Sequence, residues 1–445
     1  MSDEKPEKKL DVHVGTRSRT IQADYLARVE GEGALYIRTK EGKVEEVFLK
    51  IFEPPRFFEA LLRGRELFDA PDITARICGI CPIAYQMSAV YAMENALGAE
   101  LPEYLHQLRR LLYCGEWIES HTLHVYMLHA PDFLGYPDAI QMAKDYETAV
   151  KRGLRIKKAG NAIVRLLGGR EIHPINVKVG GFYQIPKKEE LLKLVELLQK
   201  AREEAQETVR WVNGFSFPDL QRRYECVSLY SDTEYPMARG SIASSSGLKI
   251  HAKEYDDHFE EVQVPHSTAL HSKIKGKGSY LVGPMARYNL NREKLSPLVQ
   301  ETIRSIGFEE TCTNPFRSII VRALEILYAC DEALRIIDAY EPSKRAGSVD
   351  LVMRSSTGFA ATEAPRGLLY HRYKVNGKGI IEDAKITPPT SQNQKTIEED
   401  LFQFVSQNAA MPDEELKWKC EQAIRNYDPC ISCSAHFLKL TRQNG

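Results

Sequence analysis

Apolar and polar residues alternate near the N-terminus in the pattern of a β-hairpin. Leu35-Tyr36-Ile37 and the segment 44–49 flank a turn at residues 41–43, and this period of two is typical of half-buried strands. The preceding segment, residues 28–33, contains two glycines, which allow unusual backbone angles beside Glu30.

Most of the remaining chain has the periodicity of amphipathic or buried helices. Pro82 suits the first position of one of these helices and Gly98 its end, and Ser296 is the expected N-cap of another. The segments predicted to be helical are 55–67, 83–97, 101–128, 140–167, 187–212, 297–306, 314–337 and 396–427.

Four stretches lack this helical periodicity. Residues 168–186 are glycine-rich and predict a loop with short extended pieces. Residues 220–290 alternate in short runs, which indicates a β-containing lobe. Residues 348–363 are polar and irregular, whereas residues 367–386 have the pattern of a β-hairpin that turns at Asn376-Gly377.

These elements predict a mainly α (α+β) fold, a long helical bundle with peripheral β-elements. We expect a disordered tail over residues 1–10, a single domain over residues 11–436 and a C-terminal tail over residues 437–445 that is a candidate for processing. The chain has 445 residues, which is enough for one large core with insertions.

Composition narrows the class of protein. The chain is 43% hydrophobic and 27% charged, as expected for a globular enzyme. Its 60 Lys and Arg residues balance 61 Asp and Glu residues, so no net charge favours nucleic acid or an anionic membrane. No window of about 18 apolar residues predicts membrane insertion, and the charged N-terminus lacks a secretory signal. We therefore expect a cytoplasmic protein.

Two short cysteine pairs lie almost the length of the chain apart: Cys78 with Cys81, and Cys430 with Cys433. Four thiolates first suggest a Cys₄ zinc site, but structural zinc pairs usually lie about 12 to 20 residues apart. The wide separation favours an iron–sulfur or mixed transition-metal site over structural zinc, with unrelated pairs as a third alternative. The predicted helix N-terminus after Cys81 should also lower the pKa of the first pair.

The residues around both pairs resemble a known family. Residues 76–82 (Arg-Ile-Cys-Gly-Ile-Cys-Pro) and 428–436 (Asp-Pro-Cys-Ile-Ser-Cys-Ser-Ala-His) are similar to the two signature motifs of the [NiFe]-hydrogenase large subunit. The first motif and the residues after it resemble the cytoplasmic, NADP-linked sulfhydrogenase α-subunit branch. Further blocks match in the family's order, at residues 28–31, 280–287, 363–367 and 388–390.

This resemblance implies a fold in which the two motifs meet at a buried metal centre. Cys78 and Cys430 would be terminal ligands of nickel, and Cys81 and Cys433 would bridge nickel to an iron that carries CO and two cyanides. The reaction would be the reversible oxidation of H₂ to protons and electrons. Cys430 is a natural first base, and Glu30 matches the carboxylate that carries the proton outward.

The resemblance also assigns residues around the two metals. Arg366 would hold a fixed cation over them, and Asp428 would orient it. The residues expected near the ligands of the iron are Pro365, Leu369, Pro389 and Thr390, of which Thr390 would donate a hydrogen bond to a cyanide. A second metal, magnesium or iron, would be held by Glu59 and His436 near the C-terminus.

One position departs from the pattern of many uptake hydrogenases. Within Trp117-Ile118-Glu119-Ser120-His121, the aspartate of those enzymes is replaced by Ser120. Without the resemblance, Glu30 would be an ordinary surface glutamate, Arg366 a member of an ion pair and His436 a partly exposed histidine.

Electrons must leave through a partner, because the chain has no further cysteine cluster for Fe–S, no Gly-rich nicotinamide fingerprint and no flavin motif. The resemblance implies an Fe–S small subunit, a flavoprotein (diaphorase) and a ferredoxin-like subunit that lead to NADP(H), with sulfur or polysulfide as other acceptors, and maturation proteins. The alternatives are an NAD-coupled or other cofactor-coupled hydrogenase, a complex I-like subunit, which lacks the four cysteines, and a Cys₄ zinc protein.

The other cysteines and histidines are expected to have structural roles only. Cys114, Cys226, Cys312, Cys330 and Cys420 lack pair spacing and are expected to be buried small hydrophobic residues. The histidines at positions 121, 124 and 129 spread over a wide arc of a helix, which favours core packing and hydrogen bonding over metal binding.

Overall fold

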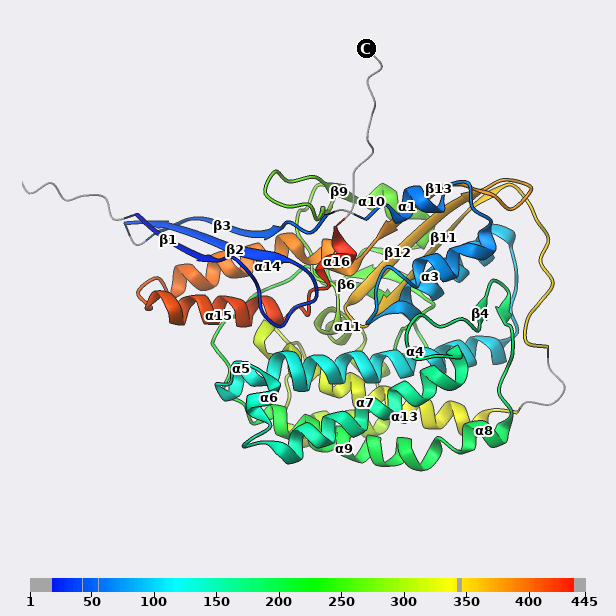
Figure 1. Cartoon of the computed structure of the whole chain (residues 1–445), viewed down its shortest axis with the longest axis horizontal. Helices are drawn as coiled ribbons and strands as arrows, with labels where there is room; N and C mark the ends of the chain where they lie inside the picture. The colour runs from blue at the N-terminus through cyan, green and yellow to red at the C-terminus, as the bar shows by residue number, and fades with distance from the viewer. Residues whose placement is uncertain (1–17, 42, 55, 342–345, 436–445) are drawn as a thin grey trace, which may run out of the picture.

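The computed structural model describes residues 18–41, 43–54, 56–341 and 346–435 (Figure 1). A bundle of helices lies in the lower half of this view, and both ends of the described chain lie in the upper half, beside the sheets. The expected tails at residues 1–10 and 437–445 lie outside the described residues.

Four long helices form the bundle. They are α4 (Glu103–Leu123), α7 (Glu147–Gly168), α9 (Val195–Asn213) and α13 (Ser318–Ala339), and α4 contacts both α7 and α13, while α9 contacts α7 and α13. Two facing glycines let α4 and α7 approach closely, because a Cβ on Gly160 would lie 2.6 Å from the carbonyl oxygen of Gly115.

The predicted N-terminal hairpin is confirmed as β2 (Gly33–Lys40) and β3 (Lys43–Ile51). A third antiparallel strand, β1 (Ser18–Ala23), pairs with β2 and lies within residues 11–52, whose pattern is strand-like. The inner faces of β2 and β3 are buried, and β3 packs against α14 (Pro389–Gln407).

A second sheet covers α3 (Pro82–Leu97), which begins at Pro82 and is followed by Gly98 as its C-cap, as predicted. The predicted hairpin is confirmed as β12 (Gly367–Val375) and β13 (Ile381–Thr387). The turn lies where it was predicted but extends to Gly379, which adopts a left-handed conformation at φ +78°, and Asn376 Oδ1 accepts hydrogen bonds from two backbone amides of the turn.

The prediction that residues 348–363 are irregular is wrong for their second half. These residues pair with β12 as β11 (Ser356–Ala364), whose small side chains lie against α3. At Gly358 the strand lies so close to α3 that an added Cβ would be 2.6 Å from the amide nitrogen of Ala96. Small residues fit this close contact, but a run of small and polar residues lacks the alternating apolar pattern from which a strand is predicted.

Several predicted helices change length or divide. The predicted helix at residues 55–67 is shorter in the structure and forms only α1 (Phe58–Leu62), whereas the one at residues 101–128 continues past α4 as a π-helix, His124–His129. The other three segments divide. Residues 140–167 form the short α6 (Ala139–Met142) and α7, residues 187–212 form α8 (Lys188–Leu192) and α9, and the last segment forms parts of α14 and α15 (Asp413–Arg425). Helix α12 (Pro297–Ile306) has the predicted bounds, but the Ser296 side chain makes no capping hydrogen bond.

The remaining elements are short. The helices are α2 (Ala70–Thr74), α5 (Ala130–Leu134), α10 (Tyr255–His258), α11 (Pro284–Asn291) and α16 (Ile431–Ser434). The strands are β4 (Val177–Lys178), β5 (Gly181–Phe182), β6 (Val227–Tyr230), β7 (Ser241–Ser244), β8 (Lys249–Ile250), β9 (Phe259–Val262) and β10 (His271–Ile274). Among the described residues, every helix is too short or too polar to cross a membrane.

The close contact between β11 and α3 predicts the effect of one methyl group. We expect Gly358→Ala to lower the free energy of unfolding by about 1–3 kcal/mol or more, because the sheet and α3 must separate. Gly377→Ala is the matched control, since a Cβ at Gly377 meets no atom within 4 Å. Denaturant unfolding of both variants measures the difference, and equal midpoints would contradict this packing.

Candidate metal centre

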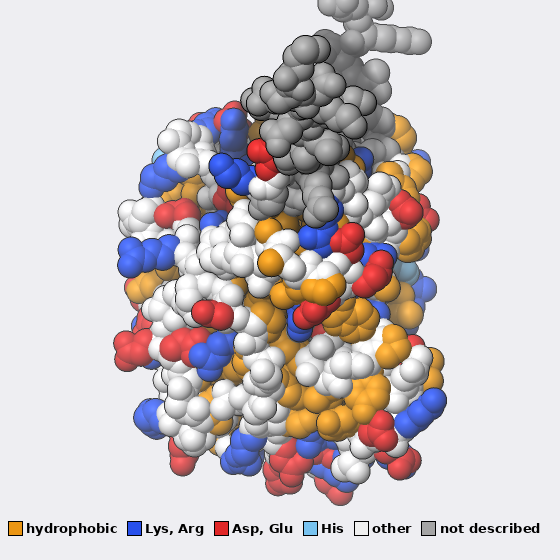
Figure 2. Space-filling model, turned by 90° about the vertical axis from the view of Figure 1, so that its left-hand side faces the viewer, with side chains coloured by type: hydrophobic (Ala, Val, Ile, Leu, Met, Phe, Trp, Pro, Cys, Tyr) orange, Lys and Arg blue, Asp and Glu red, His pale blue; other side chains and the backbone are white. Residues whose placement is uncertain are grey.

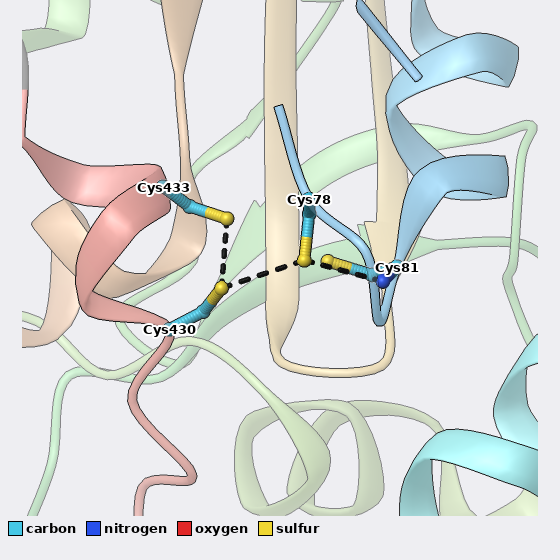
Figure 3. A group of neighbouring side chains, drawn as sticks. All are labelled: Cys78, Cys81, Cys430 and Cys433. Atoms are coloured by element: carbon cyan, nitrogen blue, oxygen red, sulfur yellow. Dashed lines mark hydrogen bonds between the residues drawn. The ribbon is translucent and has the colours of Figure 1, made fainter. Parts of the chain in front are cut away.

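The four motif cysteines meet in one buried cluster, as predicted (Figure 3). Cys81 is the N-cap of α3, and Cys433 lies on α16, which follows Cys430. The Sγ atoms of Cys78 and Cys430 are 3.5 Å apart, and those of Cys430 and Cys433 are 2.8 Å apart. All four sulfurs lie within 4.8 Å of one another, so they suit a compact centre with soft thiolate ligands.

A buried glutamate holds the first cysteine loop in place. Glu116, on α4, accepts hydrogen bonds from the amides of Ile83 at 2.7 Å and Ala84 at 3.1 Å, which are in the first turn of α3. It thereby caps the helix that follows Cys81. Burial raises the pKa of Glu116 well above its usual value. No local sequence pattern could have indicated this contact between two helices.

The four thiols shift one another's pKa because they lie in one buried cluster. Hydrogen bonds from the other three lower the pKa of Cys78, and the amides of Ile80 and Cys81 also donate to its sulfur at 3.3 Å. The prediction of a lowered pKa is wrong for Cys81. Its hydrogen bond with Cys430 would lower its pKa, but contacts with Cys433 and Cys78, together with burial, raise it.

Glu30 lies directly against the second cysteine pair. The thiol of Cys430 donates to Glu30 Oε2 at 3.1 Å, and the amide of Ser432 donates to the same oxygen at 3.1 Å. The amide of Ile431 donates to the carbonyl oxygen of Glu30 at 2.9 Å. This approach requires Gly31, whose φ is +89° and whose Cβ would lie 2.7 Å from the Cβ of Ile431.

A second carboxylate continues this network toward the surface. The hydroxyl of Ser432 donates to Glu53 Oε2 at 2.8 Å. Glu53 also pairs with the partly exposed Arg56 at 3.0 Å, and Arg56 donates to the carbonyl of Ile77. Sequence reasoning missed Glu53, because it lies outside the cysteine motifs and only the fold brings it to Ser432.

Arg366 and Asp428 form the predicted buried pair. The Nε of Arg366 donates to the carbonyl of Asp428 at 2.7 Å, and its Nη2 donates to the carboxylate at 3.2 Å. Burial alone would lower the pKa of Arg366, but Asp428 and the cluster thiolates raise it well above its usual value. Its Nη1 is buried without a hydrogen-bond partner among the described residues, so one donor remains for a further ligand of the centre.

The other residues predicted around the centre are all buried. The hydroxyl oxygen of Thr390 accepts a hydrogen bond from the amide of Cys430 at 3.0 Å, which leaves its own hydrogen for another acceptor. Leu369 lies on β12, Pro389 is the first residue of α14, and the carbonyl of Pro365 accepts a hydrogen bond from Arg287.

The predicted second metal site is described only in part. Glu59 Oε1 accepts a hydrogen bond from the amide of Ile386 at 2.7 Å. Glu59 lines a cavity together with Cys433 and Ala435, so it lies near the end of the second motif. His436 lies outside the described residues.

Two buried hydroxyl groups have no hydrogen-bond partner among the described residues. Ser120 is buried on α4, and its hydroxyl has no hydrogen bond among the described residues. The hydroxyl of Tyr85, on α3, is likewise unpaired, and burial followed by the charges of Cys433 and Cys81 raises its pKa. Sequence reasoning missed Tyr85, which appears there as one aromatic residue of a buried helix.

The other cysteines and histidines have the structural roles that were predicted for them. The five remaining cysteines are free and buried, and burial raises the pKa of each. The side chain of His121 lies 2.9 Å from Glu325, that of His124 bonds the carbonyl of Arg425, and His129 packs against Phe133.

Comparison with known proteins points to one family. The sequence profile of the nickel-dependent hydrogenases matches residues 56–152 and 254–436. Sulfhydrogenase 2 subunit alpha of Pyrococcus furiosus is 37% identical over 94% of this chain and 100% of its own length. The alpha subunit of sulfhydrogenase 1 from the same organism is 35% identical over 94% of this chain and 98% of its own length.

Solved structures agree with this match. A chain of an NAD⁺-reducing [NiFe]-hydrogenase in the H₂-reduced state superposes with a TM-score of 0.85 at 25% identity and covers 94% of this chain and 99% of its own. A [NiFeSe]-hydrogenase of Dm. baculatum shares the fold, with a TM-score of 0.77 at 21% identity over 94% of this chain and 100% of its own.

The cluster geometry predicts that each of its thiols is needed to retain metal. We expect Cys81→Ser to lose the bound nickel and iron, because a hydroxyl is a poor replacement for a bridging or terminal thiolate. Cys420→Ser is the control, since this buried cysteine lies on α15 outside the cluster. Elemental analysis of the matured protein measures both metals, and full metal content in Cys81→Ser would contradict the assignment.

Proposed function

The chain belongs to the nickel-dependent hydrogenase family and is the catalytic large subunit of a [NiFe]-hydrogenase. We propose that the complex that contains this subunit oxidises H₂ reversibly and uses NADP(H) as its distal electron carrier. The observation that supports the catalytic role is the buried cluster of four thiols from both ends of the chain, in which the thiol of Cys430 is hydrogen-bonded to Glu30. The NADP(H) part rests on the similarity to the sulfhydrogenase alpha subunits.

We assign a ligand role to each cysteine. Cys78 and Cys430 would hold nickel as terminal ligands, and Cys81 and Cys433 would be shared between nickel and an iron that carries CO and two cyanide ligands. When bound, this centre supplies the site at which H₂ is polarised and split. Thr390 and Pro389, at the start of α14, and Pro365 and Leu369, at the adjoining sheet, would surround the ligands of the iron. The Thr390 hydroxyl, whose hydrogen is unused in its hydrogen bond with the Cys430 amide, would donate to one cyanide.

The proton leaves through a chain of short contacts. The thiolate of Cys430 takes the proton and passes it to Glu30, whose Oε2 is 3.1 Å from the sulfur. Ser432 positions both carboxylates, because its amide donates to Glu30 at 3.1 Å and its hydroxyl donates to Glu53 at 2.8 Å, so the proton would pass between the two carboxylates and not through the amide. Glu53 pairs with the partly exposed Arg56, so it is the outermost carboxylate of this route. Proton transfer between positioned groups at these distances suits general acid–base catalysis.

Arg366 supplies a fixed positive charge beside the four thiolates. Its guanidinium cannot lose its proton under these conditions, and Asp428 orients it through two hydrogen bonds. Its unpaired Nη1 is the donor that is available to a ligand of the centre. The positive charge also offsets the mutual repulsion of thiolates in a buried site.

A second metal, magnesium or iron, is part of the proposal. Glu59 lines the cavity that ends at Ala435, and it would share the metal with His436. Its carboxylate is held by the amide of Ile386.

Electron transfer requires partner subunits. We assign an Fe–S small subunit, a flavoprotein and a ferredoxin-like subunit in a cytoplasmic complex, and maturation proteins that load the metals. Figure 2 shows hydrophobic side chains gathered over the lower part of the face at the left of Figure 1, and contiguous exposed apolar surface of this kind is typical of protein interfaces. An NAD-coupled complex is the second candidate, because the subunit beta of an NAD-reducing hydrogenase of Cupriavidus necator is 26% identical over 95% of this chain.

Removing the carboxylic acid of Glu30 should block proton transfer without loss of metal. We expect Glu30→Gln to lower the rate of H₂ oxidation by about 100-fold or more, since an amide cannot carry the proton. The measurement is H₂ uptake by the matured complex, together with nickel and iron content and the infrared bands of CO and cyanide. Absence of those bands from active wild-type complex would overturn the [NiFe] assignment.

Two neighbouring glutamates serve as comparisons. Glu32→Gln changes an exposed side chain that bonds the hydroxyl of Tyr25, and it should leave turnover unchanged. Glu53→Gln should slow turnover less than Glu30→Gln, since water can replace an outer relay group more easily than the inner one. Wild-type turnover in Glu30→Gln would remove Glu30 from the route.

The acceptor is tested on the complex purified with its partners. We expect H₂-dependent reduction of NADP⁺ by the whole complex, and the loss of this reduction when the large and small subunits are separated from the flavoprotein. Dye reduction with H₂ is the control that the catalytic pair is intact. A complex that reduces NAD⁺ and leaves NADP⁺ unreduced would favour the second candidate.

A further inference from the structure

Outside the four-cysteine cluster, two histidines and one glutamate converge below the N-terminal sheet. His266 lies in the loop between β9 and β10, His271 begins β10, and Glu398 lies on α14. Their ligand atoms lie within 4.8 Å of one another. We propose that this His–Glu cluster (His266, His271 and Glu398) is a second metal-binding site of the chain, for a borderline divalent ion such as Zn²⁺.

His271 carries the main argument. His271 is only 5% exposed, and its side-chain Nε2 has no hydrogen-bond partner among the described residues. An unsatisfied buried nitrogen is costly in a folded protein. Burial, followed by the charges of His266 and Lys395, lowers the pKa of His271 to about 4. The ring is therefore neutral at pH 7, the form of histidine that binds metals.

The other two ligands are already held near this nitrogen. His266 Nε2 lies 2.7 Å from Glu398 Oε1, which also accepts the amide of Leu49 at 3.2 Å. Phe48 packs on the His266 ring, with 4.5 Å between the ring centres. Two ligands about 2.0 Å from a tetrahedral ion are about 3.3 Å apart, so binding needs only a small opening of the His266–Glu398 contact.

The ligand set selects the type of ion. Two imidazoles and one carboxylate suit zinc and its neighbours better than magnesium or calcium, which prefer oxygen ligands. Lys395 opposes a cation, because its ammonium is 4.0 Å from Glu398 Oε2. Its side chain is half exposed, so it can turn toward water when the ion binds.

The bound ion would fasten the loop at residues 263–271 to α14. That loop already bonds the end of β3, since the amide of Thr268 donates to the carbonyl of Ile51 at 2.8 Å, and Ala269 forms a bridge with Ala435. The same helix α14 presents Thr390 to Cys430. The site thus joins elements that support the second cysteine motif, while its own ligands remain distinct from the four thiols.

The test is zinc loading of the matured complex after a chelator wash. We expect the wild-type complex to bind one more zinc ion per large subunit than His271→Phe, which keeps an aromatic ring but removes both nitrogens. X-ray absorption of the bound zinc should show nitrogen or oxygen neighbours at about 2.0–2.1 Å and no sulfur at about 2.3 Å. His251→Phe changes an exposed histidine outside the cluster and should bind as wild type does.

A second variant keeps the test decisive if His271→Phe folds poorly. Because His266 is partly exposed, the fold should tolerate His266→Ala more easily. This variant should weaken zinc binding by about 100-fold or more, which exceeds the loss of about 10–100-fold that is typical when a residue that only hydrogen-bonds to a metal ligand is removed. Equal zinc content in wild type and both variants, or a sulfur neighbour, would overturn the site. H₂ uptake is measured in parallel, so that failure here is distinguished from failure of the hydrogenase assignment.

Discussion

The structure depends on holding four thiol groups together in a buried site. Thiolates repel one another, and burial disfavours each negative charge, so the protein must hold the cysteines before metal binds. It does this from both sides: Glu116 caps α3 behind Cys81, and the backbone of Glu30 pairs with the chain at Cys430. Arg366 adds a positive charge that cannot be neutralised by proton loss. The cluster therefore exists as a geometry of the fold.

Buried charge networks carry this geometry into the helical bundle. Asp132 joins Arg425, at the end of α15, to Arg28, just before Glu30. Arg287 similarly joins Glu325 on α13 to Glu363 on β11, next to the loop that carries Arg366. Breaking such a buried pair by removing one partner typically costs about 3–5 kcal/mol. The two cysteine motifs are thus tied to the same bundle, although they come from opposite ends of the sequence.

The division of labour within the site follows from where each group lies. Cys430 is buried, and in the proposed route its proton passes to Glu30 and then toward Glu53, while Ser432 positions both carboxylates. The described residues hold one cluster of four cysteines, and in the proposed complex the electrons pass to other subunits. In the proposed function, a proton route inside the chain and an electron route through its partners separate the two products of one reaction.

Local sequence patterns determined most of the helices, the two hairpins and the identity of the four thiols, because periodicity and motif spacing are properties of neighbouring residues. They failed for β11, whose Gly, Ala and Thr residues pair and pack only when β12 and α3 are present. They also missed Glu116, Glu53 and the His–Glu cluster, whose members meet across distant segments. Tertiary structure alone decided these contacts, since burial and hydrogen bonding between elements have no local signature. For the same reason the sequence could name Cys78 and Cys430, but only folding places their sulfurs 3.5 Å apart.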